Sequence, residues 1–168
     1  EYTLKIKIAD IESTSAEVTN AAYYQEIVLK ISKTAEKKKE SVLLTNVKDW
    51  IFTFMTGVEN SASNSVAGTG TNDVATNGVP FWLTVDFKEV KNVTDVQTTH
   101  WGAGYAPSKV EIFSSENGDD WVSIGQWDTK GRTQTITFDE RVKTRYLKYQ
   151  MITVPSRVDI TRFYIYAW

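Results

Sequence analysis

The chain has 168 residues, 41% of them hydrophobic and 24% charged, which suits one globular domain or one domain with a fragment of another. Its formal net charge of -2, with no basic stretch beyond "EKKKE", argues against nucleic-acid binding. Without cysteine it can form no disulfide and no zinc–thiolate site, and because no apolar run approaches the roughly 20 residues of a membrane span, we expect no membrane insertion.

The first 39 residues are predicted to form a unit of their own. "TLKIKIADI" and "EIVLKIS" alternate apolar and polar residues, so each predicts a half-buried strand. Two strands alone are marginally stable and need a partner sheet, and the chain starts at Glu1 already in strand-like sequence, which indicates a fragment or a processed product. The lysine-rich segment 34–40 has no apolar face. We therefore divide the chain into domains 1–39 and 40–168, the alternative being a charged loop inside one domain.

From residue 41 onward the sequence predicts many short strands separated by turns. No segment keeps a helical period over three turns, and Asn117-Gly118 is a strong hairpin signal between two strands. A Gly, Ser, Thr and Asn-rich loop, 57–80, is longer than most loops, which favours a functional role. This pattern predicts an all-β antiparallel sandwich or jelly roll. The expected strands are 49–55, 81–87, 93–101, 108–115, 121–127, 133–139, 144–152 and 160–168.

Three stretches carry a family resemblance. They are "PFWLTVDF", "YAPSKVEIFSSENGDDWVSIG" and "FDERVKTRYLKYQM", in this order. Together they resemble the discoidin family, also called the F5/8 (coagulation-factor) type C domain, over about residues 41–168, and its bacterial branch, the family-32 carbohydrate-binding modules. The resemblance implies a galactose-binding-domain-like jelly roll with two extra strands at the N-terminus. Residues 1–39 resemble the end of an immunoglobulin-like domain, as in surface lipoproteins of Bacteroidetes. We therefore expect an exported protein, at the bacterial cell surface (outer membrane) or in the periplasm, with further domains in a longer polypeptide.

The resemblance also implies structural roles. Trp82 and Trp121 open strands after turns, where an indole can close the end of a sandwich core. Arg145 is mostly structural in the family and bonds carbonyls or a carboxylate such as Asp86, so we keep this pair out of the binding site.

Family members also hold a structural calcium ion, and here the pattern departs. Ala67 precedes Gly68 where an acid is usual, and Arg162 stands where the last strand usually has a glutamate. Losing two carboxylates removes most of the attraction for calcium. We expect no calcium and no other cofactor, with Arg162 supplying the positive charge. The alternative is a shifted site that uses Thr71 and Asp73.

The segment "THWGAGYAP" is the first candidate for ligand binding. A sugar packs its C–H face on an aromatic ring, and its hydroxyl groups need polar partners. Trp101 and Tyr105 offer rings, His100 offers a donor and an acceptor, and the glycines let a ligand approach closely. Because neighbouring strand residues face opposite sides, His100 and Trp101 can share a site only if the strand has ended. The alternatives are a buried, hydrogen-bonded histidine and aromatic residues that merely pack.

Other candidates lie on loops expected at the same end. Arg157 could bind two hydroxyl groups or a carboxylate through its forked guanidinium, and Asn60 and Asn64 are polar groups suited to sugars. A surface salt bridge is the alternative for Arg157. The "DTKGR" turn, 128–132, cannot be assigned to either end from the sequence.

The sequence does not predict an enzyme. It has one histidine and no Gly-x-Ser-x-Gly elbow, and nothing sets two carboxylates across a cleft as a glycosidase needs. We expect a non-catalytic module that binds galactose-type glycans and captures them for transport or for a neighbouring enzyme. The alternatives are a protein-interaction or adhesion domain and a spacer within a surface protein.

Overall fold

The structure is a computed structural model that describes residues 40–61, 66 and 73–168. The two N-terminal strands, and the division into domains 1–39 and 40–168, concern residues outside this range and stay predictions. Within the described residues, no helix is long and apolar enough to cross a membrane.

Antiparallel strands make up most of the regular structure of the described chain, which also contains the 3₁₀ helix η2 (Ala103–Tyr105), and this confirms the predicted all-β fold. The strands are β1 (Val42–Leu43), β2 (Ile51–Phe54), β3 (Val74–Thr76), β4 (Trp82–Thr99), β5 (Lys109–Ser115), β6 (Val122–Asp128), β7 (Thr133–Thr153), β8 (Val158–Ile160) and β9 (Arg162–Ala167). They form one large sheet in the order β1-β9-β4-β7-β5-β6, with β2 beside β4, and a small sheet of β3 and β8.

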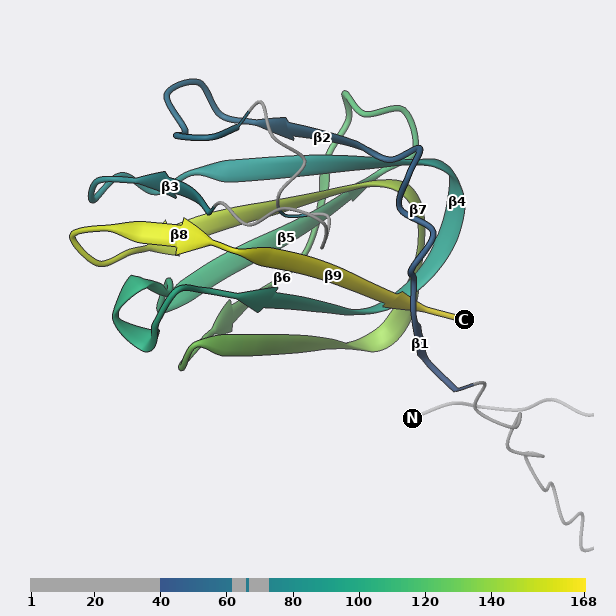
Figure 1. Cartoon of the computed structure of the whole chain (residues 1–168). Helices are drawn as coiled ribbons and strands as arrows, with labels where there is room; N and C mark the ends of the chain where they lie inside the picture. The colour runs from purple at the N-terminus through teal and green to yellow at the C-terminus, as the bar shows by residue number, and fades with distance from the viewer. Residues whose placement is uncertain (1–39, 62–65, 67–72) are drawn as a thin grey trace, which may run out of the picture. The chain divides into compact units, whose positions relative to one another are not determined.

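The two long strands, β4 and β7, each pass through both layers of the sandwich. Residues 82–86 pair with 146–150, and after a bend residues 95–99 pair with 133–137. Figure 1 shows both strands turning over at the same end of the molecule. The alternating pattern of the sequence predicts two separate strands in place of each of them. That expectation was wrong because each strand continues past its bend, where the pairing of β4 with β7 is irregular between Asp86 and Lys91 and Lys88 takes a left-handed conformation, φ 67°.

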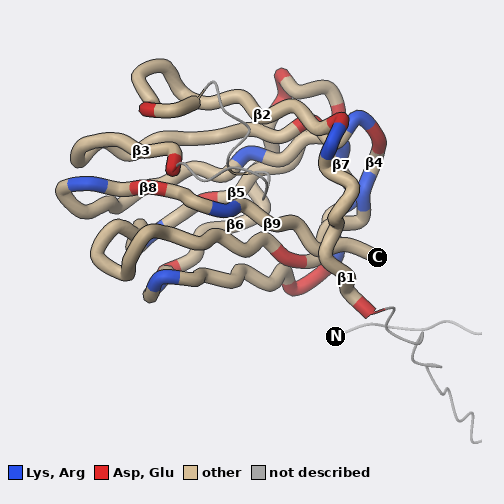
Figure 2. Tube along the Cα trace, viewed as in Figure 1, with Lys and Arg blue, Asp and Glu red and all other residues tan. Residues whose placement is uncertain are grey.

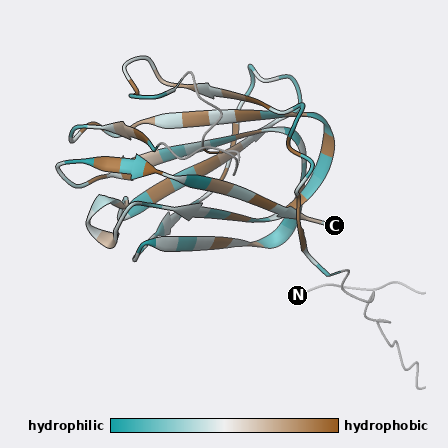
Figure 3. Cartoon of the chain, in the orientation of Figure 1, coloured by the Kyte–Doolittle hydropathy of each residue, from teal (hydrophilic) through white to brown (hydrophobic). Residues whose placement is uncertain are grey.

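The core lies between the two layers and follows the predicted alternation. In β4, Leu83, Val85 and Phe87 are buried, whereas Trp82 and Thr84 face outward. Figure 3 shows this change of hydropathy from residue to residue along the strands. Figure 2 shows charges of both signs gathered at the bends of β4 and β7. The apolar face is therefore turned inward along the length of each long strand.

Trp82 and Trp121 do not close the core, which corrects the role expected for them. Both are half-buried and line a groove that also contains outward-facing β4 and β7 residues. Trp50, which precedes β2, is the tryptophan buried in the core, with its ring 4.8 Å from that of Phe87. Indoles at 82 and 121 thus remain available to solvent.

The predicted hairpin at Asn117-Gly118 is confirmed. It joins the antiparallel strands β5 and β6, and the Asn117 side chain accepts hydrogen bonds from the backbone N–H groups of Asp119 and Asp120, both at 2.9 Å. Gly118 has φ +88°, and a Cβ placed there would lie 3.2 Å from Cε1 of Tyr146. Glycine is therefore required both by the backbone conformation and by the close approach of the ring.

We expect Gly118→Ala to lower the free energy of unfolding by about 1–2 kcal/mol, because the new methyl group meets the Tyr146 ring and the left-handed backbone is strained. Gly104→Ala is the matched control, since no atom lies within 4 Å of its added Cβ. Urea denaturation of both variants measures the difference. Equal stability of the two variants would contradict this account of the turn.

Candidate ligand-binding site

Four connecting segments of the described chain gather at the end of the sandwich opposite the bends of β4 and β7 (Figure 1). These segments, here called the loop end, are residues 55–61, 77–80, 100–108 and 154–157. The β3–β8 sheet ties them together, and Glu59 extends it through a bridge to Ala75. The "DTKGR" turn also reaches this end, because Arg132 Nε donates to the His100 carbonyl at 3.0 Å.

Trp101 and Tyr105 are exposed at the loop end. β4 ends at Thr99, and η2 then turns the chain with a hydrogen bond from the Tyr105 N–H to the Gly102 carbonyl, 3.0 Å. The Trp101 side chain is 68% exposed and that of Tyr105 39% exposed. Two aromatic rings on one short turn can offer packing faces to a ligand.

His100 is a correction to the predicted site. Its side chain is 0% exposed. The ring therefore cannot make the ligand contact that was predicted from the sequence. Nδ1 lies within hydrogen-bond distance of the Asp159 carbonyl, which accepts and so places the proton on Nδ1, and Nε2 lies 3.0 Å from Thr98 Oγ1. Burial lowers the pKa of His100, which favours the neutral ring. The strand ends at Thr99, before both residues, and the His100 side chain turns inward while that of Trp101 is exposed.

Asp159, which the sequence analysis did not select, holds this turn in place. Its carboxylate accepts the Trp101 N–H at 2.9 Å, while its carbonyl accepts from His100. The side chain is buried, and burial raises the pKa of Asp159 to about 6. The available signal was an acid between two β-branched residues, Val158 and Ile160, in a short apolar strand.

Arg157 makes the surface ion pair that was its alternative role. Its guanidinium donates to Glu59 Oε2 at 2.9 Å and to Asn77 Oδ1 at 3.0 Å. The ion pair lowers the pKa of Glu59 through that hydrogen bond, and both side chains remain more than one-third exposed. The exposed part of the Arg157 side chain leaves room for a ligand, so Arg157 stays a predicted contact.

Of the two predicted asparagine contacts, only Asn60 lies within the described residues. Asn60 sits in a left-handed conformation, φ 57°, and its Nδ2 donates to the Asp73 carbonyl at 2.9 Å. It thus helps to shape the loop end, and its contact with a ligand stays a prediction. Asn64 lies outside the described residues.

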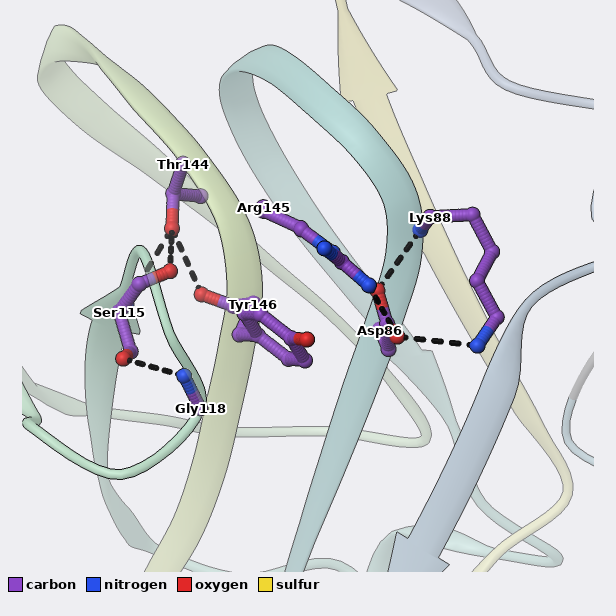
Figure 4. Close-up of polar contacts among 7 residues, drawn as sticks. All are labelled: Asp86, Lys88, Ser115, Gly118, Thr144, Arg145 and Tyr146. Atoms are coloured by element: carbon purple, nitrogen blue, oxygen red, sulfur yellow. Dashed lines mark hydrogen bonds and ion pairs between the residues drawn. The ribbon is translucent and has the colours of Figure 1, made fainter.

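Arg145 and Asp86 form the structural pair that was expected, away from the loop end. Arg145 Nε and Nη2 donate to the two carboxylate oxygens at 3.0 and 3.1 Å, and the backbone N–H of Lys88 donates to Oδ1 at 2.8 Å. Figure 4 shows Arg145 and Lys88 converging on the carboxylate. The Arg145 hydrogen bonds hold the pKa of Asp86 well below its usual range. The pair fixes β7 to the bend of β4.

The described residues do not supply an evident calcium site. Arg162 is half-buried at the start of β9, where its Nη1 donates to the Thr161 carbonyl at 2.6 Å. In the described part of the chain no three His, Asp or Glu residues are grouped closely enough to hold a metal ion. The carbonyl of Asp73 already accepts from Asn60, and Ala67 and Thr71 lie outside the described range. The absence of calcium stays a prediction.

The buried carboxyl of Asp159 predicts a pH effect on stability. Because its folded-state pKa is raised, the stability it contributes is present below about pH 4 and is lost as the pH rises through about 6. Between pH 4 and pH 7 the free energy of unfolding of the wild type should therefore fall relative to that of Asp159→Asn, by up to about 3 kcal/mol. Asparagine keeps an oxygen for the Trp101 N–H, and His100 is present in both proteins.

Urea denaturation of both proteins at several pH values gives this difference, and carboxyl ¹³C NMR reports the titration of Asp159 directly. Parallel stability profiles, or a carboxyl resonance that titrates near pH 4, would contradict the assignment.

Comparison with known proteins agrees with the observed fold. No curated protein matches the chain. Among solved structures, the family 32 carbohydrate-binding module of Clostridium perfringens NanJ in complex with galactose is 22% identical, covers 70% of this chain and 93% of its own, and has a TM-score of 0.56. The C. perfringens module CpGH89CBM32-5, in complex with GalNAc-β-1,3-galactose, is 18% identical over 70% of this chain and 95% of its own, with a TM-score of 0.58. The C-terminal domain of a Bacteroides fragilis chitobiase is 17% identical over 76% and 98%, with a TM-score of 0.62.

These likenesses establish a jelly-roll sandwich of the expected class. The family itself rests on the match of residues 53–163 to the F5/8 type C domain, whose members are non-catalytic binding modules. That match confirms the family resemblance of the region after residue 40, whereas the immunoglobulin-like start stays a prediction. Since the match spans well over half of the sequence, the chain belongs to the F5/8 type C domain family.

Proposed function

We propose that this chain is a non-catalytic glycan-binding module that holds a galactose-type sugar at its loop end. The observation that carries the proposal is Trp101, a large aromatic side chain 68% exposed on a turn whose backbone is fixed. The fold neighbours bound to galactose and to GalNAc-β-1,3-galactose support the choice of sugar.

The turn that carries Trp101 is rigid for a physical reason. The Trp101 N–H donates to the buried carboxylate of Asp159. Two backbone hydrogen bonds, from Tyr105 to the Gly102 carbonyl and from Ala106 to the Ala103 carbonyl, close η2. Binding a sugar therefore requires little ordering of the protein, which lowers the entropic cost of association. The pyranose C–H face would pack on the indole, with Tyr105 beside it on the same turn.

Polar recognition would come from the neighbouring strand end. Arg157 immediately precedes β8, the short strand whose Asp159 anchors Trp101, and it presents a guanidinium at the surface. Its exposed pair with Glu59 is weakly held in water and can share donors with sugar hydroxyl groups. His100 supports the site from beneath by bonding Asp159, without touching the ligand.

A single site of this size binds weakly, with a dissociation constant of roughly millimolar to tens of micromolar, or about 4–7 kcal/mol. We further propose that the chain belongs to an exported protein of the bacterial cell surface or periplasm, where capturing glycan for transport or for a neighbouring enzyme would make weak binding useful. A protein-interaction or adhesion domain remains the second candidate, because the exposed Trp101 and Tyr105 would equally suit a protein partner.

We expect Trp101→Ala to weaken galactose binding roughly tenfold or more, because an exposed aromatic platform supplies much of the contact energy in such a site. Val122→Ala is the matched control, since Val122 is also 68% exposed but lies on β6. Titration calorimetry with galactose, repeated with a calcium chelator, measures both variants.

Unchanged binding by Trp101→Ala would remove the loop end as the site. A folded protein that binds no glycan on an array, with or without chelator, would favour the interaction domain or a spacer instead.

A further inference from the structure

A second concave surface lies on the outer side of the layer formed by β2, the first part of β4 and the last part of β7. It is a groove of about 500 Å³. None of the exposed loop-end candidates, Trp101, Tyr105 or Arg157, lines it. We call it the sheet groove, and it is lined by Ile51, Thr53, Trp82, Thr84, Asp86, Asn117, Gly118, Asp119, Trp121, Tyr146 and Lys148.

The floor of the sheet groove is set by strand register. Thr53, Thr84 and Lys148 are directly paired across β2, β4 and β7, and Ile51, Asp86 and Tyr146 form the next outward-facing row. The residues between these rows point inward, and in β4 and β7 they belong to the core. The floor is therefore rigid, and no loop has to close to form it.

Aromatic rings make up much of the lining. Trp82 opens β4, Tyr146 lies on β7 and Trp121 ends the β5–β6 turn; each is half-buried. Gly118 packs so closely on the Tyr146 ring that a Cβ would sit 3.2 Å from it, which holds the turn against the sheet. Figure 4 shows Tyr146 between this turn and the Arg145–Asp86 pair. Two half-exposed indoles on a fixed support suit the C–H faces of sugar rings.

Lys148 supplies the positive charge among the residues that line the groove. Its ammonium nitrogen lies 5.3 Å from the Trp82 ring and 5.3 Å from the Phe113 ring, and in the described part of the chain no carboxylate pairs with it. Two acids also line the groove: Asp86, on the floor, is neutralised by Arg145 and by Lys88, whereas Asp119 lies exposed on the β5–β6 turn. A ligand therefore meets a cation held over an aromatic ring.

We propose that the sheet groove is a second glycan-binding site, specific for an acidic oligosaccharide built from uronic acid residues. Lys148 would pair with a sugar carboxylate, while Trp82 and Trp121 pack against the sugar rings. The proposal does not depend on galactose binding at the loop end. Two sites on one rigid sandwich would let the module hold a branched or long glycan more tightly than either site alone.

The test maps binding on the whole chain by ¹⁵N NMR, with α-1,4-trigalacturonate as the probe and the neutral α-1,4-galactotriose as its matched control. The two sugars differ only in carrying carboxylates or hydroxymethyl groups. We expect trigalacturonate to shift the indole N–H signals of Trp82 and Trp121 and the amides of β4 and β7, and galactotriose to shift them less. Shifts confined to the loop end, equal groove shifts with both sugars, or no shifts would each overturn the proposal.

Variants separate the two sites. Lys148→Met should weaken trigalacturonate binding by about fivefold, the size expected of one exposed ion pair, while Lys143→Met, on the same strand but outside the groove, should not. Trp101→Ala should leave trigalacturonate binding unchanged even though it weakens galactose binding. Equal affinities of the two lysine variants would contradict the role of Lys148, and loss of groove shifts in Trp101→Ala would show that there is one site.

Discussion

The pairing of β4 with β7 is the constraint on which the rest of the structure depends. The two strands pair at residues 82–86, 91–93 and 95–99 of β4, on both sides of an irregular bend, so one ladder holds both layers together. β2 and β9 then add to β4, and β5 adds to β7. Asp86 and Arg145 lock the ladder where it bends, by two parallel charge-assisted hydrogen bonds. Both surfaces with ligand chemistry are positioned by this one ladder.

At the loop end, a buried acid decides what faces solvent. Burying a carboxyl group is costly, and the raised pKa of Asp159 reflects that cost. The hydrogen bond from the Trp101 N–H offsets part of it and fixes the backbone just where β4 ends. His100, bonded to the carbonyl of the same residue, fills the interior. Asp159 thus holds both the turn that exposes the Trp101 indole and the buried imidazole of His100.

The two proposed sites differ in charge, and this difference underlies the different sugar proposed for each. At the loop end the cation, Arg157, already has an acidic partner in Glu59, so the local charge is close to balanced and neutral hydroxyl groups are well matched. In the sheet groove the floor acid, Asp86, is neutralised by Arg145 and Lys88, the second acid, Asp119, lies exposed on the β5–β6 turn, and Lys148 has no carboxylate partner among the described residues. Packing on aromatic rings is common to both surfaces, and the charge distinguishes them.

The sequence by itself determined the fold class, the family, the Asn117-Gly118 hairpin and the Asp86–Arg145 pair, because strand alternation, turn chemistry and short motifs are local signals. It also selected Trp101 and Tyr105, which the structure leaves exposed. Only the tertiary structure decided that β4 and β7 run unbroken through their bends, that His100 is buried and that Trp82 and Trp121 face a groove. Those outcomes depend on which distant strands lie opposite each residue, and on Asp159, which is 59 residues from the histidine that it binds. No local pattern carries that information.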